Sequence, residues 1–272
     1  MRTQAASVNL YWLVAGAGCY ACNYLTRACR LWLFSRKEVP LFPTTFKITC
    51  LHGINTYFFP FRTGELTLPL LYKAYAETGY SLGLRFLVRA RLLDFAGLGI
   101  LVIVSSSLLT SRLPPELKTV FLMLGLGFVM IPYAAVYCLR LDTPMIKKWR
   151  EKAIGLRLPA YPNFQEITVS LLIWLWIGGT IFCVARSLNL PLSFFDVLFL
   201  VTFQLPLQII PVQGIANAGN HEAAWLGALA LLGVKREVIV PLALSSHVVL
   251  IGYVLVLGLV ASLLPAGNRR RT

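Results

Sequence analysis

The chain has 272 residues, of which 57% are hydrophobic and 13% are charged. A soluble domain carries about twice that share of charged residues, so the composition excludes an ordinary soluble protein and indicates an all-α polytopic membrane protein. The net charge of +14 raises nucleic acid as a partner. That class is excluded because the basic residues are divided among short connections. In a membrane protein, such residues mark the cytoplasmic connections.

The first half of the chain alternates long apolar runs with a shorter, interrupted pair of runs. About 20 apolar residues are enough to cross the hydrocarbon core as a helix. Basic residues at the ends of the runs predict which connections are cytoplasmic. The predicted elements are a span at residues 8–33, helical stretches at 42–60 and 66–80 joined by a tip at 60–65, a basic connection with Arg85, Arg89 and Arg91, and a span at 92–109.

The second half repeats this order after one additional span. Its hairpin is built around a polar tip that contains Gly214 and Gly219 between two apolar runs. Three arginines at residues 269–271 follow the last span, which predicts a cytoplasmic C-terminus. The predicted elements are a span at 120–139, a strongly basic connection at 140–165, a span at 167–185, helical stretches at 194–210 and 223–233 joined by a tip at 211–222, and a span at 238–264.

Taken together, the elements predict an inverted-topology repeat with two re-entrant or broken helical hairpins. The whole chain, residues 1–272, is then a single transmembrane domain of the plasma (inner) membrane. Repeat one covers about 8–112, a linking span about 118–140, and repeat two about 165–265. Re-entrance is favoured because the second limb of each hairpin is short for a full crossing. The alternative is two ordinary helix pairs whose tips lie in water.

Two of the eleven acidic residues, Glu65 and Glu222, lie at the two predicted tips. Placing a carboxylate inside a bilayer costs several kcal/mol of free energy, so it is expected to contact a partner, to line a cavity or to have a function. We expect both to take part in substrate translocation, paired with Arg62 and Arg89 or exchanging protons. The alternative is a purely structural ion pair.

Arg62 and the free N–H groups of a broken helix are groups that bind phosphate. Arg91 and Asp94 are three residues apart and can pair on one helix. With Arg85 and Arg89, they predict a funnel for an anionic headgroup at the cytoplasmic leaflet. The alternative is that this cluster only marks the cytoplasmic side.

Other polar residues at the second tip are expected either to contact the headgroup or to satisfy the broken backbone. His247 lies within the last span and is either a hydrogen-bonded core residue or a functional group. The histidines are not spaced as metal ligands, so we expect neither a metal nor a cofactor. The tip residues concerned are Gln213, Asn217, Asn220 and His221.

Four motifs in order resemble the flippase-like transmembrane domain of lysylphosphatidylglycerol synthases and its stand-alone relatives, from about residue 27 onward. The second tip is poorer in glycine than is usual in that family, Ala90 replaces an acid, and His247 replaces an arginine. The fold is therefore expected to carry over, whereas the lipid substrate is not. The motifs are Ala28-Cys-Arg-Leu-Trp32, Asn55 with Pro60-Phe-Arg-Thr-Gly-Glu65, Arg91-Leu-Leu-Asp94, and Pro211 with Gly219-Asn-His-Glu222.

The resemblance implies a lipid transporter that moves a phosphate-bearing or polyprenyl-linked lipid across or out of the membrane by alternating access. Because the sequence lacks the soluble catalytic domain of the synthases, we expect no lipid aminoacylation and no enzyme activity. Two alternatives stay open: an intramembrane lipid-modifying enzyme, and a non-transporting partner subunit of an envelope lipid machine. The expected partner is a membrane lipid, and a homo-oligomer or envelope-biosynthesis partners also remain open.

Overall fold

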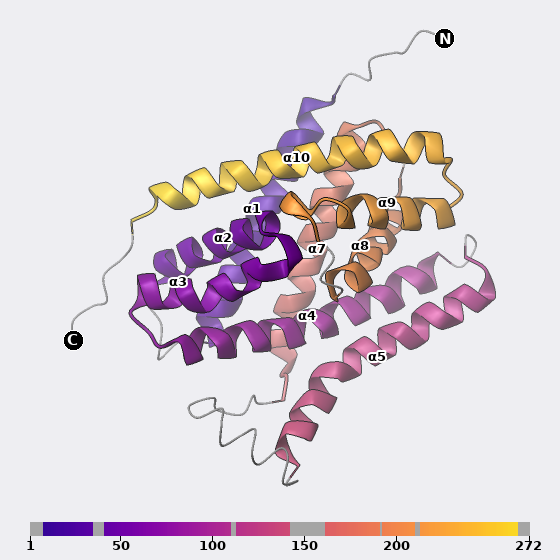
Figure 1. Cartoon of the computed structure of the whole chain (residues 1–272). Helices are drawn as coiled ribbons and strands as arrows, with labels where there is room; N and C mark the ends of the chain where they lie inside the picture. Colours follow the sequence, from indigo (N-terminus) through magenta and orange to yellow (C-terminus); the bar gives the residue numbers. More distant parts are fainter. Residues whose placement is uncertain are drawn as a thin grey trace.

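The computed structural model describes residues 8–34, 41–109, 113–141, 161–190, 192–209 and 213–265, with the backbone alone for 204–209. Every regular element in these ranges is a helix, which confirms the all-α prediction (Figure 1). Residues 142–160 of the basic connection predicted at 140–165, the arginines at 269–271 and Pro211 lie outside the described residues.

The first half of the chain forms a long helix, a helical hairpin and a second long helix. The hairpin turns through a short 3-10 segment, η1, in which Phe61 and Arg62 have positive φ angles of 53° and 59°. The polar tip predicted at 60–65 is therefore a break between two helices. The elements are α1 (Leu10–Phe34), α2 (Phe42–Phe58), η1 (Pro60–Leu66), α3 (Thr67–Ala76) and α4 (Tyr80–Leu108).

The second half has the same order, preceded by the linking helix α5. Among the described residues, α5, α7 and α10 are long and apolar enough to cross a bilayer. The predicted tip ends earlier than expected, because Asn220, His221 and Glu222 form the first turn of α9. The elements are α5 (Pro115–Arg140), α7 (Phe164–Ser187), α8 (Phe194–Ile209), η2 (Ile215–Asn217), α9 (Asn220–Leu231) and α10 (Arg236–Leu263).

The structure corrects one prediction in the first half. Arg85, Arg89 and Arg91 are not in a connection before the second span, since α4 is continuous from Tyr80 to Leu108. Arg, Leu and Ala all favour helix, and neither Gly nor Pro interrupts residues 84–96. Arg89 and Arg91 also have carboxylate partners within the fold, so the helix can pack with these charges inside it.

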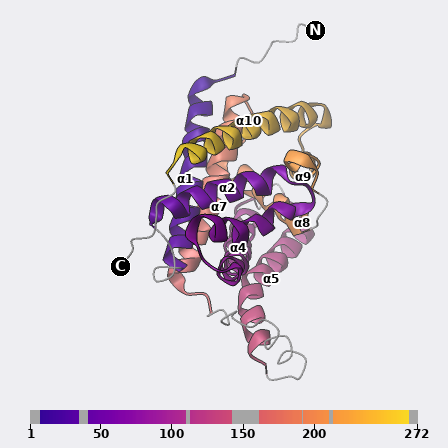
Figure 2. The ribbon, with the colours of Figure 1, turned by 60° about the vertical axis from the view of Figure 1, so that its left-hand side comes forward.

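The two hairpins lie between α4 and α10, and α1 packs along α7 behind them (Figures 1 and 2). The two halves of the chain pack on each other in the same way. Helix α4 of the first half packs on α8 of the second hairpin, and α10 of the second half packs on α2 of the first hairpin. Close packing at the first tip depends on Gly64. A Cβ added there would lie 2.1 Å from the Asn55 carbonyl oxygen, so a larger residue would push η1 away from α2.

The largest apolar core joins the second unit to α4 and α5. Its fully buried side chains include Leu98, Phe199, Trp225 and Leu229. A second cluster, with Ile48, Leu68 and Tyr72 among its members, joins the first hairpin to α4. Each hairpin is thus anchored by its own apolar contacts.

Candidate functional site

The two tips touch each other. The Phe61 N–H donates to the Gln213 carbonyl oxygen at 2.8 Å, directly across from one tip to the other. Gln213 also donates from Nε2 to the carbonyl oxygens of Thr56 (3.0 Å) and Tyr57 (3.2 Å). These carbonyls belong to the last turn of α2, where no helical N–H remains to pair with them. Gln213 therefore caps the first hairpin from the second, and so serves as a structural link between the tips.

Both tips hold non-glycine residues in the left-handed region of backbone space. At the second tip these are Ala216 (φ 54°) and Asn217 (φ 63°), which correspond to Phe61 and Arg62 at the first. Each such residue costs on the order of 1–3 kcal/mol unless its surroundings stabilise it. The contact with Gln213 supports Phe61 at the first tip, and a hydrogen bond between His247 and the Ala216 carbonyl oxygen supports the second.

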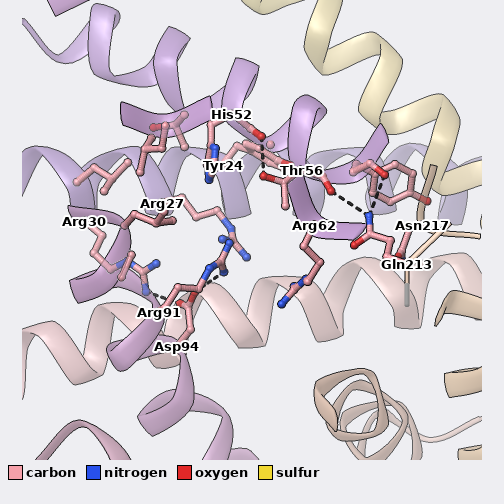
Figure 3. A pocket seen from close by; sticks show the side chains of 17 residues that line it. Tyr24, Arg27, Arg30, His52, Thr56, Arg62, Arg91, Asp94, Gln213 and Asn217 are labelled. Atoms are coloured by element: carbon pink, nitrogen blue, oxygen red, sulfur yellow. Dashed lines mark hydrogen bonds and ion pairs between the residues drawn. The ribbon is translucent and has the colours of Figure 1, made fainter. Parts of the chain in front are cut away.

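A cavity of about 200 Å³ lies beside the joined tips, between α1, α2 and α4. Its described lining includes one carboxylate, Asp94, and four arginines from three different elements. Figure 3 shows these labelled basic side chains converging on one space, with Gln213 and Asn217 of the second tip at its edge. The four arginines are Arg27, Arg30, Arg62 and Arg91.

A buried ion network forms one wall of the cavity. Arg30, which is 3% exposed, donates from Nη1 to Asp94 Oδ1 at 2.6 Å, and Ser170 Oγ lies 2.9 Å from the same nitrogen. Arg91 donates to Asp94 Oδ2 at 3.0 Å and to both carboxylate oxygens of Glu65. The network therefore ties α1, α4, α7 and the first tip together.

The arginines outnumber the carboxylates that pair with them. Set against Asp94 and Glu65, the four arginines leave a formal charge of +2. Arg62 reaches Glu65 only at 3.8 Å, and its buried Nε has no hydrogen-bond partner in the structure. The buried hydroxyl of Tyr57, which also lines the cavity, likewise has none. Buried polar groups are nearly always satisfied, so Arg62 and Tyr57 are candidates to donate hydrogen bonds to an anion in the cavity.

A second polar cluster lies on the other side of the second tip. His247 of α10 has its Nδ1 2.5 Å from Glu222 Oε1 and its Nε2 2.7 Å from the Ala216 carbonyl oxygen. The ring of His221 stacks on that of His247 at 4.9 Å. This cluster joins η2, α9 and α10 and does not line the cavity.

The structure therefore divides the predicted site residues. It brings Arg62, Arg91, Asp94, Gln213 and Asn217 together around the cavity, with Glu65 bound to Arg91. It places His221, Glu222 and His247 in the second cluster, and it buries Asn220 at the start of α9.

The expected pairing of Glu65 and Glu222 with Arg62 and Arg89 is wrong for Glu222 and Arg89. Arg89 instead binds Glu166 at the start of α7, with Nη2 at 2.5 Å from Oε1. The reason is helical geometry: Arg89 lies on a different face of α4 from Arg91 and meets the N-terminus of α7. Glu222 is instead bound by His247.

Sequence reasoning missed several residues of the cavity. Arg27 and Arg30 lie before the end of the span predicted at 8–33 and were not among the predicted site residues, although Arg30 belongs to one of the four family motifs. A charge within a span is itself a functional signal, and it would have identified both residues. His52 and Tyr57 are aromatic residues in an aromatic-rich stretch, and nothing in the sequence separates them from packing residues.

One comparison with known proteins finds a match. The family model of the lysylphosphatidylglycerol synthase TM region matches residues 1–258 of the chain. Comparison with curated proteins finds no match, and comparison with solved structures finds none either. The match covers nearly the whole chain. The chain therefore belongs to the lysylphosphatidylglycerol synthase TM region family, and it is an integral membrane protein of a family tied to lipid handling.

Proposed function

We propose that the protein moves a lipid with a phosphate-bearing headgroup across or out of the membrane. The observation that carries this proposal is the cavity beside the joined tips, with its formal charge of +2 and its unpartnered buried donors on Arg62 and Tyr57. Guanidinium groups bind phosphate through paired, charge-assisted hydrogen bonds. They stay protonated and hold an anion without giving up a proton. The cavity is therefore suited to binding and carrying an anion, and we propose a transporter and not an enzyme.

The surroundings of the cavity favour a lipid over a free phosphate ion. An apolar groove of about 370 Å³ lies between α1, α2 and α10, lined by residues such as Leu25, Phe46 and Val260. Tyr20 lines this groove and Tyr24 lines the cavity, and their hydroxyl oxygens are 3.3 Å apart. A headgroup in the cavity can therefore extend its acyl or prenyl chain into the groove past this tyrosine pair.

The paired hairpins support alternating access. The second limbs of the hairpins, α3 and α9, have 10 and 12 residues, so each is about 15–18 Å long, well short of the ~30 Å hydrocarbon core. We infer that the hairpins are re-entrant and enter from opposite leaflets of the plasma (inner) membrane, with the C-terminus in the cytoplasm. Rocking of one unit against the other would then open the cavity to each side in turn.

The test of this proposal is leaflet exchange in liposomes that contain the purified protein. A fluorescent phosphatidylglycerol and a labelled polyprenyl phosphate serve as probes, and an impermeant reductant destroys the label in the outer leaflet. We expect the protein to make the inner-leaflet label of at least one probe accessible within minutes. Exchange no faster than in protein-free liposomes for both probes would contradict the proposal.

Filling the apolar groove is expected to slow exchange while leaving the headgroup site intact. In Ala21→Trp, an indole is added to the floor of the groove, where the lipid chain would lie. We expect the exchange rate to fall by about tenfold, which corresponds to a barrier higher by about 1.4 kcal/mol. The matched control is Ala134→Trp, an exposed position on α5 outside the groove. Equal exchange rates in the two variants would show that the acyl or prenyl chain of the lipid does not occupy the groove.

A further inference from the structure

The proposed transport cycle assigns no role to the polar cluster in which His247 contacts Glu222 and the second tip. His247 is 8% exposed and lies midway along α10. Its two ring nitrogens both face oxygen atoms: Nδ1 lies 2.5 Å from Glu222 Oε1, and Nε2 lies 2.7 Å from the Ala216 carbonyl oxygen. The other carboxylate oxygen of Glu222 accepts the Gly219 N–H at 2.8 Å.

The two contacts of His247 need a hydrogen in each of them. A carbonyl oxygen only accepts, so Nε2 of His247 must carry a hydrogen. The 2.5 Å contact to Glu222 then needs a second hydrogen, either on Nδ1 or on the carboxyl group. In both arrangements the pair is neutral as a whole and carries two protons. A neutral imidazole beside a carboxylate would carry only one.

The neighbouring groups do not supply a different counter-charge. His221 of α9 donates from Nε2 to Ser246 Oγ at 2.8 Å, because the Ser246 hydroxyl is already donated to the Ala243 carbonyl. From α2, the Tyr57 ring meets the His247 ring edge-on. Among the described residues, neither His247 nor Glu222 forms an ion pair with Lys or Arg. The charge of the pair therefore follows its own proton.

We propose that His247 and Glu222 form a proton-binding site that holds the second tip closed and couples its opening to proton release. This inference rests on the proposed transport, for which the proton would be the coupling ion. With the proton bound, His247 holds both Glu222 and the Ala216 carbonyl. When the proton leaves to water, one N–H remains for two acceptors and the pair becomes negatively charged. One of the two hydrogen bonds must then break.

Loss of a hydrogen bond to His247 would change the conformation of the second tip beside the cavity. Ala216 and Asn217 are held in left-handed conformations, which need outside support. Asn217 lines the cavity, and Gln213 of the same segment caps α2 and accepts from Phe61 of the first tip. Releasing Ala216 from His247 therefore loosens the segment that lines one edge of the cavity and joins the two tips.

Hydrogen exchange of the full-length protein in lipid nanodiscs tests the proton site directly. After correction for the intrinsic effect of pH, we expect the amides of residues 213–219 to exchange about tenfold faster at ~pH 9 than at ~pH 5. His247→Gln and Glu222→Gln are each expected to abolish that difference, and either variant suffices if the other does not fold. Glu237→Gln, which alters an exposed carboxylate in the first turn of α10, is the control and should retain it. A wild-type protein without this pH dependence, or variants that keep it, would overturn the proposal.

Transport supplies a second readout that separates the two proposals. In liposomes with a pH gradient, the wild-type protein should drive the labelled lipid beyond equal distribution between leaflets, and His247→Gln should only equalise it. Accumulation by His247→Gln equal to that of the wild type would overturn the coupling role. If no variant moves lipid at all, the transport proposal fails, while hydrogen exchange still decides whether the proton site exists.

Discussion

Arg62→Ala is expected to slow lipid exchange by roughly 30-fold or more. Arg62 projects from the first tip into the cavity, and its buried Nε has no partner in the structure (Figure 3). Removing one partner of a buried, charge-assisted contact costs about 2–5 kcal/mol, which is roughly 30-fold or more in affinity or rate. The measurement is the rate of label loss in the leaflet-exchange assay, with the amount of folded protein matched by gel filtration.

Two further variants define the cause of this effect. Arg62→Lys keeps the positive charge but loses the planar fork that binds two phosphate oxygens, so it should restore only part of the rate. Arg236→Ala removes a positive charge at an exposed position at the start of α10 and should leave the rate unchanged. If Arg62→Ala exchanged lipid as fast as Arg236→Ala, Arg62 would not bind the headgroup.

Asp94→Asn is expected to destabilise the protein by about 3–5 kcal/mol, because it leaves a buried charge without its partner. Asp94 is the acceptor for both Arg30 and Arg91, and Arg30 is almost completely buried. In the variant, Arg91 keeps Glu65, but Arg30 keeps only uncharged acceptors, the Ser170 hydroxyl and the amide oxygen of the new side chain. The measurement is the midpoint of unfolding, by heat or by SDS titration, in a fixed lipid environment.

A double variant distinguishes lost pairing from lost packing. In Arg30→Met with Asp94→Leu, both buried charges are replaced by apolar side chains of similar volume, which is often neutral for stability. We therefore expect most of the lost stability to return, with transport still impaired. Glu116→Gln, which alters an exposed carboxylate at the start of α5, should shift the midpoint little. A double variant as unstable as Asp94→Asn would show that the ion pair is not the cause.

The sequence was most informative about the elements themselves. The long apolar runs became α5, α7 and α10, and the interrupted runs became two helical hairpins with broken tips. Both tips were found because Pro, Gly and polar residues interrupt apolar sequence, where a continuous helix would be the lowest-energy structure in lipid. That signal depends only on neighbours in the chain. The inverted repeat is an interpretation of the same pattern and remains a prediction.

The site was predicted unevenly, for a physical reason. Arg91 and Asp94 are three residues apart on a helix, so their pairing follows from the sequence and is confirmed at 3.0 Å. The pairing of Arg89 could not be predicted, because its partner Glu166 is 77 residues away on a helix that meets α4 only after folding. The same holds for Glu222 and His247, which are 25 residues apart.

By itself, the sequence determined that this chain is an all-α membrane protein of one family, with two polar tips that each carry a carboxylate. Local periodicity and the lack of water in a bilayer are sufficient for the fold class and the two tips, whereas the order of four motifs carried the resemblance to the family. Only the tertiary structure decided which side chain pairs with each carboxylate. It separated an arginine-lined cavity, with Glu65 at Arg91, from a histidine cluster with Glu222 at His247. Charges find partners by distance in space, and that distance is set by how the helices pack.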